Sequence, residues 1–238
     1  MIATFPRSGS TAFGLSLWST GILGAPLEYA HAVYAADIRE RIANTESYEV
    51  FWAELQRRRT TPNGVFSYKM MKPHILQIAR KHYSAFSSVM PTHTVLFRRR
   101  DRAAHAVSMS KAIQTSQWFS DHIQRRPPRF NLSHLLWCES IIAEDERFWV
   151  EFLRQSELPF IEVFYEDFLA DRAHELERIF DFVGCKVEDM AYNPSLEVTE
   201  VQRDGTSEIW RRRLLDAKRL LNRGFMEFDT FHALRYAD

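Results

Sequence analysis

An apolar run that passes straight into a tight turn and then into a helix places the strongest constraint on the fold of this chain. The residues Ile-Ala-Thr-Phe at 2–5 predict a buried strand, and a helix is predicted from about Thr11 to Thr20. Strand and helix patterns go on alternating along the rest of the sequence. This alternation predicts an α/β fold with a central, mainly parallel sheet flanked by helices in three layers.

The remaining elements follow from the same patterns. Further strands are predicted at about 65–71, 94–97 and 159–164, and further helices at about 37–59, 73–83, 101–119, 133–155, 171–183 and 207–221. Gly184 is typical of the position just after a helix. No segment has the composition of a linker, so we expect a single domain over residues 1–238.

Composition excludes several classes of function. The 31 basic residues balance the 31 acidic ones, so a nucleic acid partner is not indicated. Cys138 and Cys185 lack a paired spacing and predict reduced thiols. We expect neither a signal peptide nor a transmembrane segment, because no apolar run reaches about 18 residues. These features predict a cytoplasmic protein.

The turn after the first strand has the composition of a phosphate cradle. Gly9 permits a sharp turn, the following helix directs backbone N–H groups at the turn, and Ser10 and Thr11 add hydroxyl groups. Arg7 adds a fixed positive charge. The turn lacks the Gly-Lys-[Ser/Thr] ending of a Walker A loop. An ordinary strand-to-helix turn with a Ser/Thr cap is the alternative.

A second anion site is predicted at the end of the 94–97 strand. Arg99 follows this strand, and Ser108 lies about two turns into the next helix. Open α/β sheets bind ligands at the carboxyl ends of their strands. Three arginines before a helix N-terminus oppose the helix dipole, which favours an anionic ligand there. A solvated basic cluster is the alternative.

These motifs resemble those of the sulfotransferase superfamily. Pro6-Arg7-Ser8-Gly9-Ser10-Thr11 is similar to its 5'-phosphosulfate loop, and Arg99 with Ser108 to its 3'-phosphate element. The stretch Tyr165-Glu166-Asp167-Phe168 resembles a structural signature of the same superfamily. Shorter stretches near residues 20–29, 61–71 and 106–118 resemble the bacterial trehalose 2-sulfotransferase family and its lipopolysaccharide sulfotransferase relatives.

The resemblance implies a P-loop-like fold and 3'-phosphoadenosine 5'-phosphosulfate as the sulfonate donor. It implies that Arg7 and the segment Ser8, Gly9, Ser10, Thr11 bind the 5'-phosphate end of that donor. It also implies a carbohydrate or glycolipid acceptor and a homodimer. The Gly-rich cofactor loop of cytosolic members is absent, and Arg203 is expected to contact the adenosine side in its place.

The resemblance also names a general base. The trehalose-type family uses a Pro-x-Glu-[Tyr/Phe] glutamate, which corresponds to Glu28. His31, His74 and His134 are rival bases, because cytosolic sulfotransferases use a histidine. Lys69 is expected to supply a second positive charge to the reaction.

Two other functions remain open at this point. A P-loop kinase would share the strand, turn and helix but would need ATP with Mg²⁺. A sulfotransferase fold without activity would be a binding module, which the presence of Arg7, Ser10, Arg99, Ser108 and Glu28 opposes. No Asp, Glu or His cluster has metal-ligand spacing, so we expect no metal.

Overall fold

The computed structural model describes residues 1–31, 38–42, 45, 47–118, 127–196 and 204–235, with side chains as far as residue 221. The chain falls into two compact units. Residues 1–100 with 143–200 form the sheet unit, and residues 101–142 with 201–238 form the helical unit. The expectation of one domain over residues 1–238 stays a prediction.

Four short strands form the centre of the sheet unit. They are β1 (Ile2–Thr4), β2 (Lys69–Met71), β3 (Thr94–Arg98) and β4 (Phe160–Phe164). Their order is β2-β1-β3-β4, and every neighbouring pair is parallel. The predicted α/β class with a mainly parallel sheet is therefore confirmed.

Alternating side chains of the strands enter two separate cores. Ile2 belongs to one core and Ala3 to the other, and Val95 and Leu96 are divided in the same way. This division follows from the two-residue period of a strand, which points successive side chains to opposite faces. Both faces of the sheet are therefore buried, as is usual for parallel sheets.

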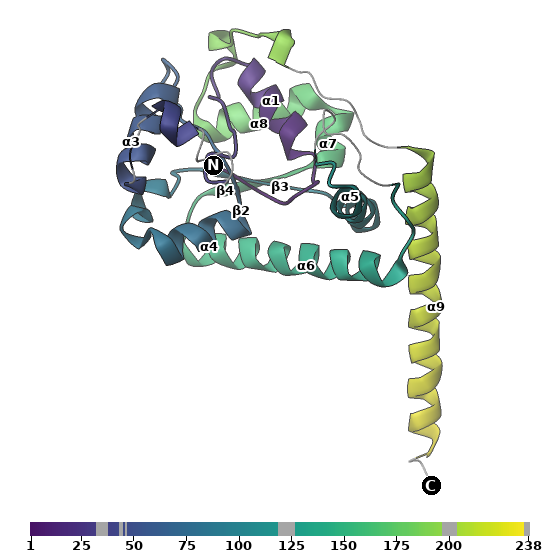
Figure 1. The fold of residues 1–238 in the computed structure, drawn as a ribbon. Coiled ribbons are helices and arrows are strands. Elements are labelled where there is room, and N and C mark those ends of the chain that lie inside the picture. The colour runs from purple at the N-terminus through teal and green to yellow at the C-terminus, as the bar shows by residue number, and fades with distance from the viewer. Residues whose placement is uncertain (32–37, 43–44, 46, 119–126, 197–203, 236–238) are drawn as a thin grey trace. The chain divides into compact units, whose positions relative to one another are not determined.

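Helices cover these two faces. Figure 1 shows α1, α7 and α8 on one side of the sheet and α4 and α6 on the other. Their bounds, with that of α3, are α1 (Ser10–Ser19), α3 (Tyr48–Arg59), α4 (Lys72–Lys81), α6 (Leu132–Gln155), α7 (Tyr165–Ala170) and α8 (Arg172–Val183). Trp149 of α6 is fully buried and donates a hydrogen bond to the Thr4 carbonyl oxygen at 3.3 Å. This contact ties α6 to the end of β1.

Some elements differ from the sequence-based expectations. The strand predicted over 65–71 is paired only from Lys69, because its partner β1 is three residues long. The helix predicted over 37–59 is interrupted, since Ser47 is extended and accepts a hydrogen bond from Val50 N–H as the N-cap of α3. Gly184 adopts the left-handed conformation after α8, as predicted.

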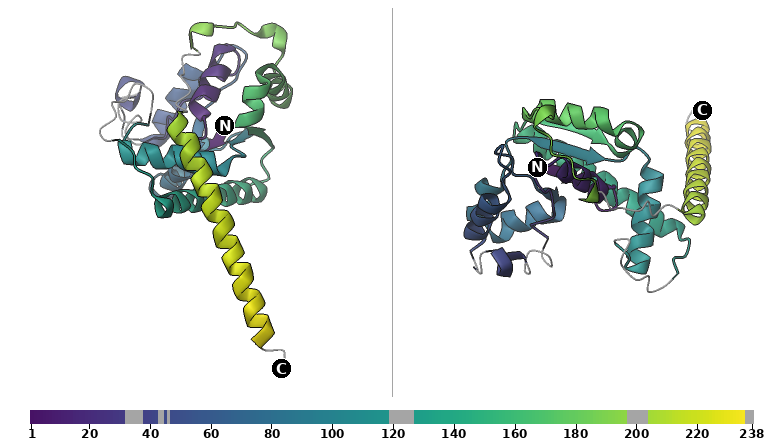
Figure 2. Two further views of the ribbon diagram at one scale, coloured as in Figure 1. Left: turned by 90° about the vertical axis from the view of Figure 1, so that its right-hand side faces the viewer. Right: turned by 90° about the horizontal axis from the view of Figure 1, so that it is seen from above.

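The helical unit contains α5 (Arg102–Thr115), the first part of α6, and α9 (Gly205–Arg235). Its core includes Ala106, Leu135, Cys138, Trp210 and Leu214. Figure 2 shows α9 as one uninterrupted helix that is longer than the predicted 207–221. Short 3₁₀ turns lie at Tyr83–Ala85, Ser87–Val89, Val187–Asp189 and Pro194–Leu196. Among the helices of the described residues, none has the length and apolar character needed to cross a membrane.

Replacing Phe13 by alanine should destabilise the protein by about 3–5 kcal/mol, because it leaves a cavity in the core below α1. Phe13 is fully buried, stacks on Phe97 at 4.2 Å between ring centroids, and meets the edge of Phe168. Chemical denaturation monitored by circular dichroism measures the loss. Tyr83→Ala is the control, because this side chain is 79% exposed and its removal should change stability by less than about 0.5 kcal/mol.

Candidate functional site

The turn between β1 and α1 has the backbone of an anion-binding loop. Arg7 and Gly9 both have left-handed backbone angles, with φ of 64° and 93°. Gly9 is the N-cap of α1, so the first N–H groups of the helix face the turn without intrahelical partners. Left-handed residues beside a helix N-terminus form concave sites lined by N–H groups.

Gly9 lies against the ring of Tyr165, at the start of α7. A Cβ atom at this position would be 2.5 Å from Cδ2 of Tyr165 and 2.6 Å from Cε2. Glycine is therefore required here for two reasons: the backbone angle is left-handed, and the nearby ring leaves no space for a side chain. The contact joins the loop after β1 to the start of α7.

Ser8 supports the loop from inside. Its hydroxyl is fully buried, donates to the Phe5 carbonyl oxygen at 2.9 Å, and lies 2.9 Å from the Thr4 hydroxyl. Its backbone N–H donates to the same carbonyl of Phe5 at 3.3 Å. Binding of the sulfonate donor by Ser8 stays a prediction. The observed contacts of its side chain stabilise the turn.

Two arginines crowd together beside the loop. Arg7 and Arg99 are both half-buried, and Arg99 follows directly after β3, as predicted. Burial, and to a lesser degree the Arg99 guanidinium, lower the pKa of Arg7. Two cations held this close repel each other, and an anion between them would offset the repulsion. The electrostatics of the loop therefore favour a negatively charged ligand.

Lys69 connects the loop to Glu28. Its ammonium lies 2.9 Å from Oε1 of Glu28 and donates a hydrogen bond to the Thr11 hydroxyl at 3.4 Å. The Lys69 side chain is 5% exposed and that of Glu28 is 14% exposed. The structure thus brings together Glu28, Lys69 and Thr11. Lys69 lies between the glutamate and the start of α1 and contacts both.

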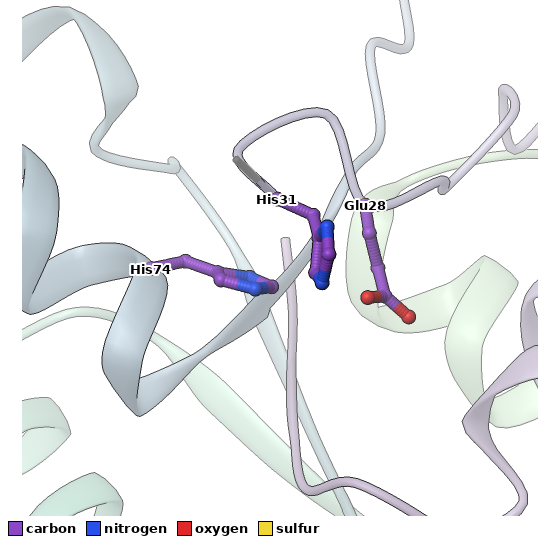
Figure 3. Close-up of side chains that lie close together, drawn as sticks. All are labelled: Glu28, His31 and His74. Atoms are coloured by element: carbon purple, nitrogen blue, oxygen red, sulfur yellow. The ribbon is translucent and has the colours of Figure 1, made fainter. Parts of the chain in front are cut away.

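Two histidines lie next to Glu28. Figure 3 shows the His31 ring between the His74 ring and the Glu28 carboxylate. The His31 and His74 rings meet edge to face, with centroids 5.5 Å apart. His74 Nδ1 accepts a hydrogen bond from the Met71 N–H at 3.3 Å, which caps α4. Burial, offset in part by Glu28, lowers the pKa of His74 to about 4, so this ring is neutral at pH 7.

The same three side chains could hold a metal ion by their distances. One ligand atom from each of Glu28, His31 and His74 lies within 4.8 Å of the others, although the sequence spacing had indicated no such cluster. Two features oppose a cation there. The Lys69 ammonium already pairs with Glu28. His74 accepts a hydrogen bond from Met71 N–H at Nδ1, so its neutral ring carries the proton on Nε2 and neither nitrogen has a lone pair to offer a metal. We therefore assign no metal to this cluster.

Three other predicted site residues belong to the helical unit or lie outside the described residues. Ser108 is half-buried on α5 in the helical unit, so its pairing with Arg99 stays a prediction. His134 also belongs to the helical unit, where its Nδ1 lies 2.8 Å from the Ser110 hydroxyl. Arg203 lies outside the described residues.

Sequence reasoning did not assign a role in the site to Tyr165. Its ring contacts Gly9, and the guanidinium of Arg99 lies over it at 4.6 Å from the centroid. The Tyr-Glu-Asp-Phe stretch resembles a structural signature, but a single sequence does not show which loop it touches. Its position directly after an apolar strand was the one available signal.

Comparison with known proteins agrees with this geometry. The model of the Stf0 sulphotransferase family matches residues 1–216. The chain belongs to this family. It is therefore a transferase of sulfonate groups, which confirms the predicted family and excludes the kinase alternative. It is also 24% identical over 254 aligned residues to the trehalose 2-sulfotransferase of Mycolicibacterium smegmatis (strain ATCC 700084 / mc(2)155), covering 90% of this chain and 92% of that protein.

His74 should make this sulfotransferase less stable in mild acid. Its pKa of about 4 in the folded protein is below the value of 6.5 for the unfolded chain, so the unfolded state binds the extra proton. The free energy of unfolding should thus fall by on the order of 2–3 kcal/mol as the pH drops from about 6.5 to 4.

His74→Gln should remove this part of the pH dependence, since glutamine can still accept a hydrogen bond from Met71 N–H. Urea denaturation at a series of pH values measures the effect. His174→Gln, at an exposed position of α8, should leave the slope unchanged. Equal slopes in all three proteins would contradict the assignment of a buried neutral ring at His74.

Proposed function

We propose that this protein transfers the sulfonate group of 3'-phosphoadenosine 5'-phosphosulfate to a hydroxyl of a carbohydrate or glycolipid, with Glu28 as the general base. The observation that carries the proposal is the bridge made by Lys69. One ammonium group contacts both the Glu28 carboxylate and the Thr11 hydroxyl of the anion loop. A base and an anion site that share one cation suit a reaction in which the acceptor loses a proton while the donor releases an anionic leaving group.

The donor would be held by its two phosphate groups. The N–H groups of Gly9, Ser10 and Thr11 would bind the 5'-phosphate with the Arg7 guanidinium, and Ser8 keeps the turn in shape. Arg99, together with Ser108 and Arg203, would bind the 3'-phosphate and the adenosine side. The crowding of Arg7 and Arg99 supports this assignment, because a doubly phosphorylated ligand would relieve it.

The reaction is an in-line displacement at sulfur. The acceptor oxygen forms a bond to sulfur while the bond from sulfur to the bridging oxygen of the 5'-phosphate breaks. The hydroxyl proton moves to the Glu28 carboxylate, and the electron pair of the broken bond stays on adenosine 3',5'-bisphosphate. The protein contributes orientation, proton removal and stabilisation of the charge that develops on the leaving oxygen.

Lys69 would couple these two events. Before the reaction its charge is compensated by Glu28 at 2.9 Å. When Glu28 accepts the proton, the carboxylate becomes neutral and the full charge of Lys69 acts on its other neighbour, the loop that holds the 5'-phosphate. The positive charge would therefore become available as negative charge builds on the leaving group. This step needs no metal ion.

The acceptor class is inferred from family membership and from the trehalose 2-sulfotransferase relative. Tyr29, the residue after Glu28, is fully buried and its hydroxyl donates a hydrogen bond to the Ala25 carbonyl oxygen, so its ring belongs to the core. Trp118 is 38% exposed and could offer a flat apolar surface to a sugar ring. A homodimer and a cytoplasmic location stay predictions.

Arg99→Ala should weaken the binding of adenosine 3',5'-bisphosphate by about ten- to hundredfold, because a charge-assisted contact to the 3'-phosphate is lost. Isothermal titration calorimetry measures the change. Arg100→Ala is the matched control, since its exposed guanidinium pairs with Asp167 and lies outside the loop. The assignment fails if Arg99→Ala binds the bisphosphate as tightly as the unchanged protein does.

Glu28→Gln should lower kcat by about a hundred- to ten-thousandfold, because it removes the base but keeps the shape. It should not weaken bisphosphate binding, because the Lys69 ammonium loses its partner carboxylate and its charge acts on the loop. Mass spectrometry of sulfated disaccharide, glycolipid or lipopolysaccharide fragments measures turnover, with a chelator in the buffer. Glu144→Gln serves as the control, because this glutamate is 58% exposed and pairs with Lys72.

Three outcomes would contradict these assignments. If Glu28→Gln keeps most of its turnover while His31→Ala is inactive, the base is His31. If the chelator abolishes turnover and a divalent ion restores it, the proposal of a metal-free reaction is wrong. Sulfation of a phenol or steroid alone would contradict the acceptor class.

A further inference from the structure

We infer that Tyr165 is a positioning residue for Arg99: the flat face of its ring holds the guanidinium in the place from which it binds the donor. The inference rests on the proposed function, because it gives Arg99 the task of binding the 3'-phosphate. It concerns a residue to which the proposed function gives no contact with the donor.

The first observation is the stack between the two side chains. The Arg99 guanidinium carbon lies 4.6 Å from the centre of the Tyr165 ring. A guanidinium over the face of an aromatic ring is attracted by the quadrupole of the ring, and it keeps its N–H groups at its edge for other partners. The stack therefore fixes the plane of the Arg99 guanidinium and leaves the N–H groups at its edge available to other partners.

The second observation is that the ring itself cannot move towards the loop. Gly9 approaches it so closely that a Cβ atom there would be 2.5 Å from the ring. Tyr165 also packs against the core between the sheet and helices α1, α7 and α8. The ring is thus held between the anion loop on one side and Arg99 on another, and it sets the spacing between the two predicted phosphate contacts.

The third observation is the neighbouring carboxylate. Oε1 of Glu166 lies 4.0 Å from Nε of Arg99, and Oε2 accepts a hydrogen bond from the Arg100 N–H at 3.0 Å. Tyr165 and Glu166 begin α7 directly after β4. One short segment therefore supplies both the surface below Arg99 and a charge beside its Nε atom.

The same strand ends contain a second stack that provides a matched control. Arg98 and Arg100 lie over the ring of Phe164 at 4.9 Å and 4.0 Å. Both of these arginines pair with acidic side chains, Glu162 and Asp167. Phe164→Leu removes an aromatic surface under arginines that have no assigned role in binding. Tyr165→Leu removes the aromatic surface under Arg99, the arginine to which the proposed function assigns donor binding.

The test is a double-mutant cycle measured by calorimetry with adenosine 3',5'-bisphosphate. Tyr165→Leu should weaken binding by about three- to tenfold, since Arg99 loses its preferred orientation. In the Arg99→Ala background the same change should lower the bisphosphate affinity by less than about twofold, because Tyr165 acts through Arg99. Tyr165→Phe should bind like the unchanged protein, since the Tyr165 hydroxyl makes no hydrogen bond within the described residues. Phe164→Leu should also leave the affinity unchanged.

The outcomes separate the two proposals. Unchanged affinity in Arg99→Ala would refute the 3'-phosphate assignment itself. If Arg99→Ala binds weakly but Tyr165→Leu costs the same factor in both backgrounds, Tyr165 acts on general structure and the inference is overturned. An equal loss in Phe164→Leu would overturn it as well. Thermal melting accompanies each variant, and Tyr165→Met, which fills a similar space without a ring, replaces the leucine variant if that one is unfolded at the assay temperature.

Discussion

The ammonium of Lys69 and the carboxylate of Glu28 form a largely buried ion pair that the candidate site depends on. Removing two charges from water is costly, and their attraction alone often does not compensate for it. Here the lysine has a second partner in the Thr11 hydroxyl, and the β2 register beside β1 holds its backbone in place. Replacing either partner alone would leave an uncompensated buried charge. The pair is therefore better explained by the chemistry it supports than by a contribution to stability.

The opposite electrostatic situation exists between two arginines beside the loop. Arg7 and Arg99 are like charges held close together, and burial with mutual repulsion lowers the pKa of Arg7. Folding energy elsewhere must offset this unfavourable arrangement, and the two apolar cores on either face of the sheet are its source. Local arrangements that oppose stability occur where a ligand is to be bound. A doubly phosphorylated donor would convert the repulsion into two attractive contacts.

Aromatic rings connect these charged groups to the core. Tyr165 packs on Gly9 and below Arg99, while Phe13 and Phe97 stack beneath α1. Because interiors are closely packed, a ring fixed on one side restricts what lies on its other side. The anion loop is thus positioned by closely packed apolar contacts.

The sequence by itself determined the α/β class, the strand–loop–helix with Arg7, Gly9 and Thr11, and the place of Arg99 at a strand end. Each of these depends on neighbouring residues whose pattern has a local physical meaning. Only the tertiary structure decided that Lys69 joins Glu28 to Thr11, that His74 is buried and neutral, and that Tyr165 lies between Gly9 and Arg99. These residues are far apart in the chain. Gly9, Arg99 and Tyr165 meet because parallel strands bring their carboxyl ends to one edge of a sheet. Lys69, Glu28 and His74 meet through the packing of the first residue of β2 against a loop and a helix. Such packing is set by shape and burial, which a one-dimensional pattern does not contain.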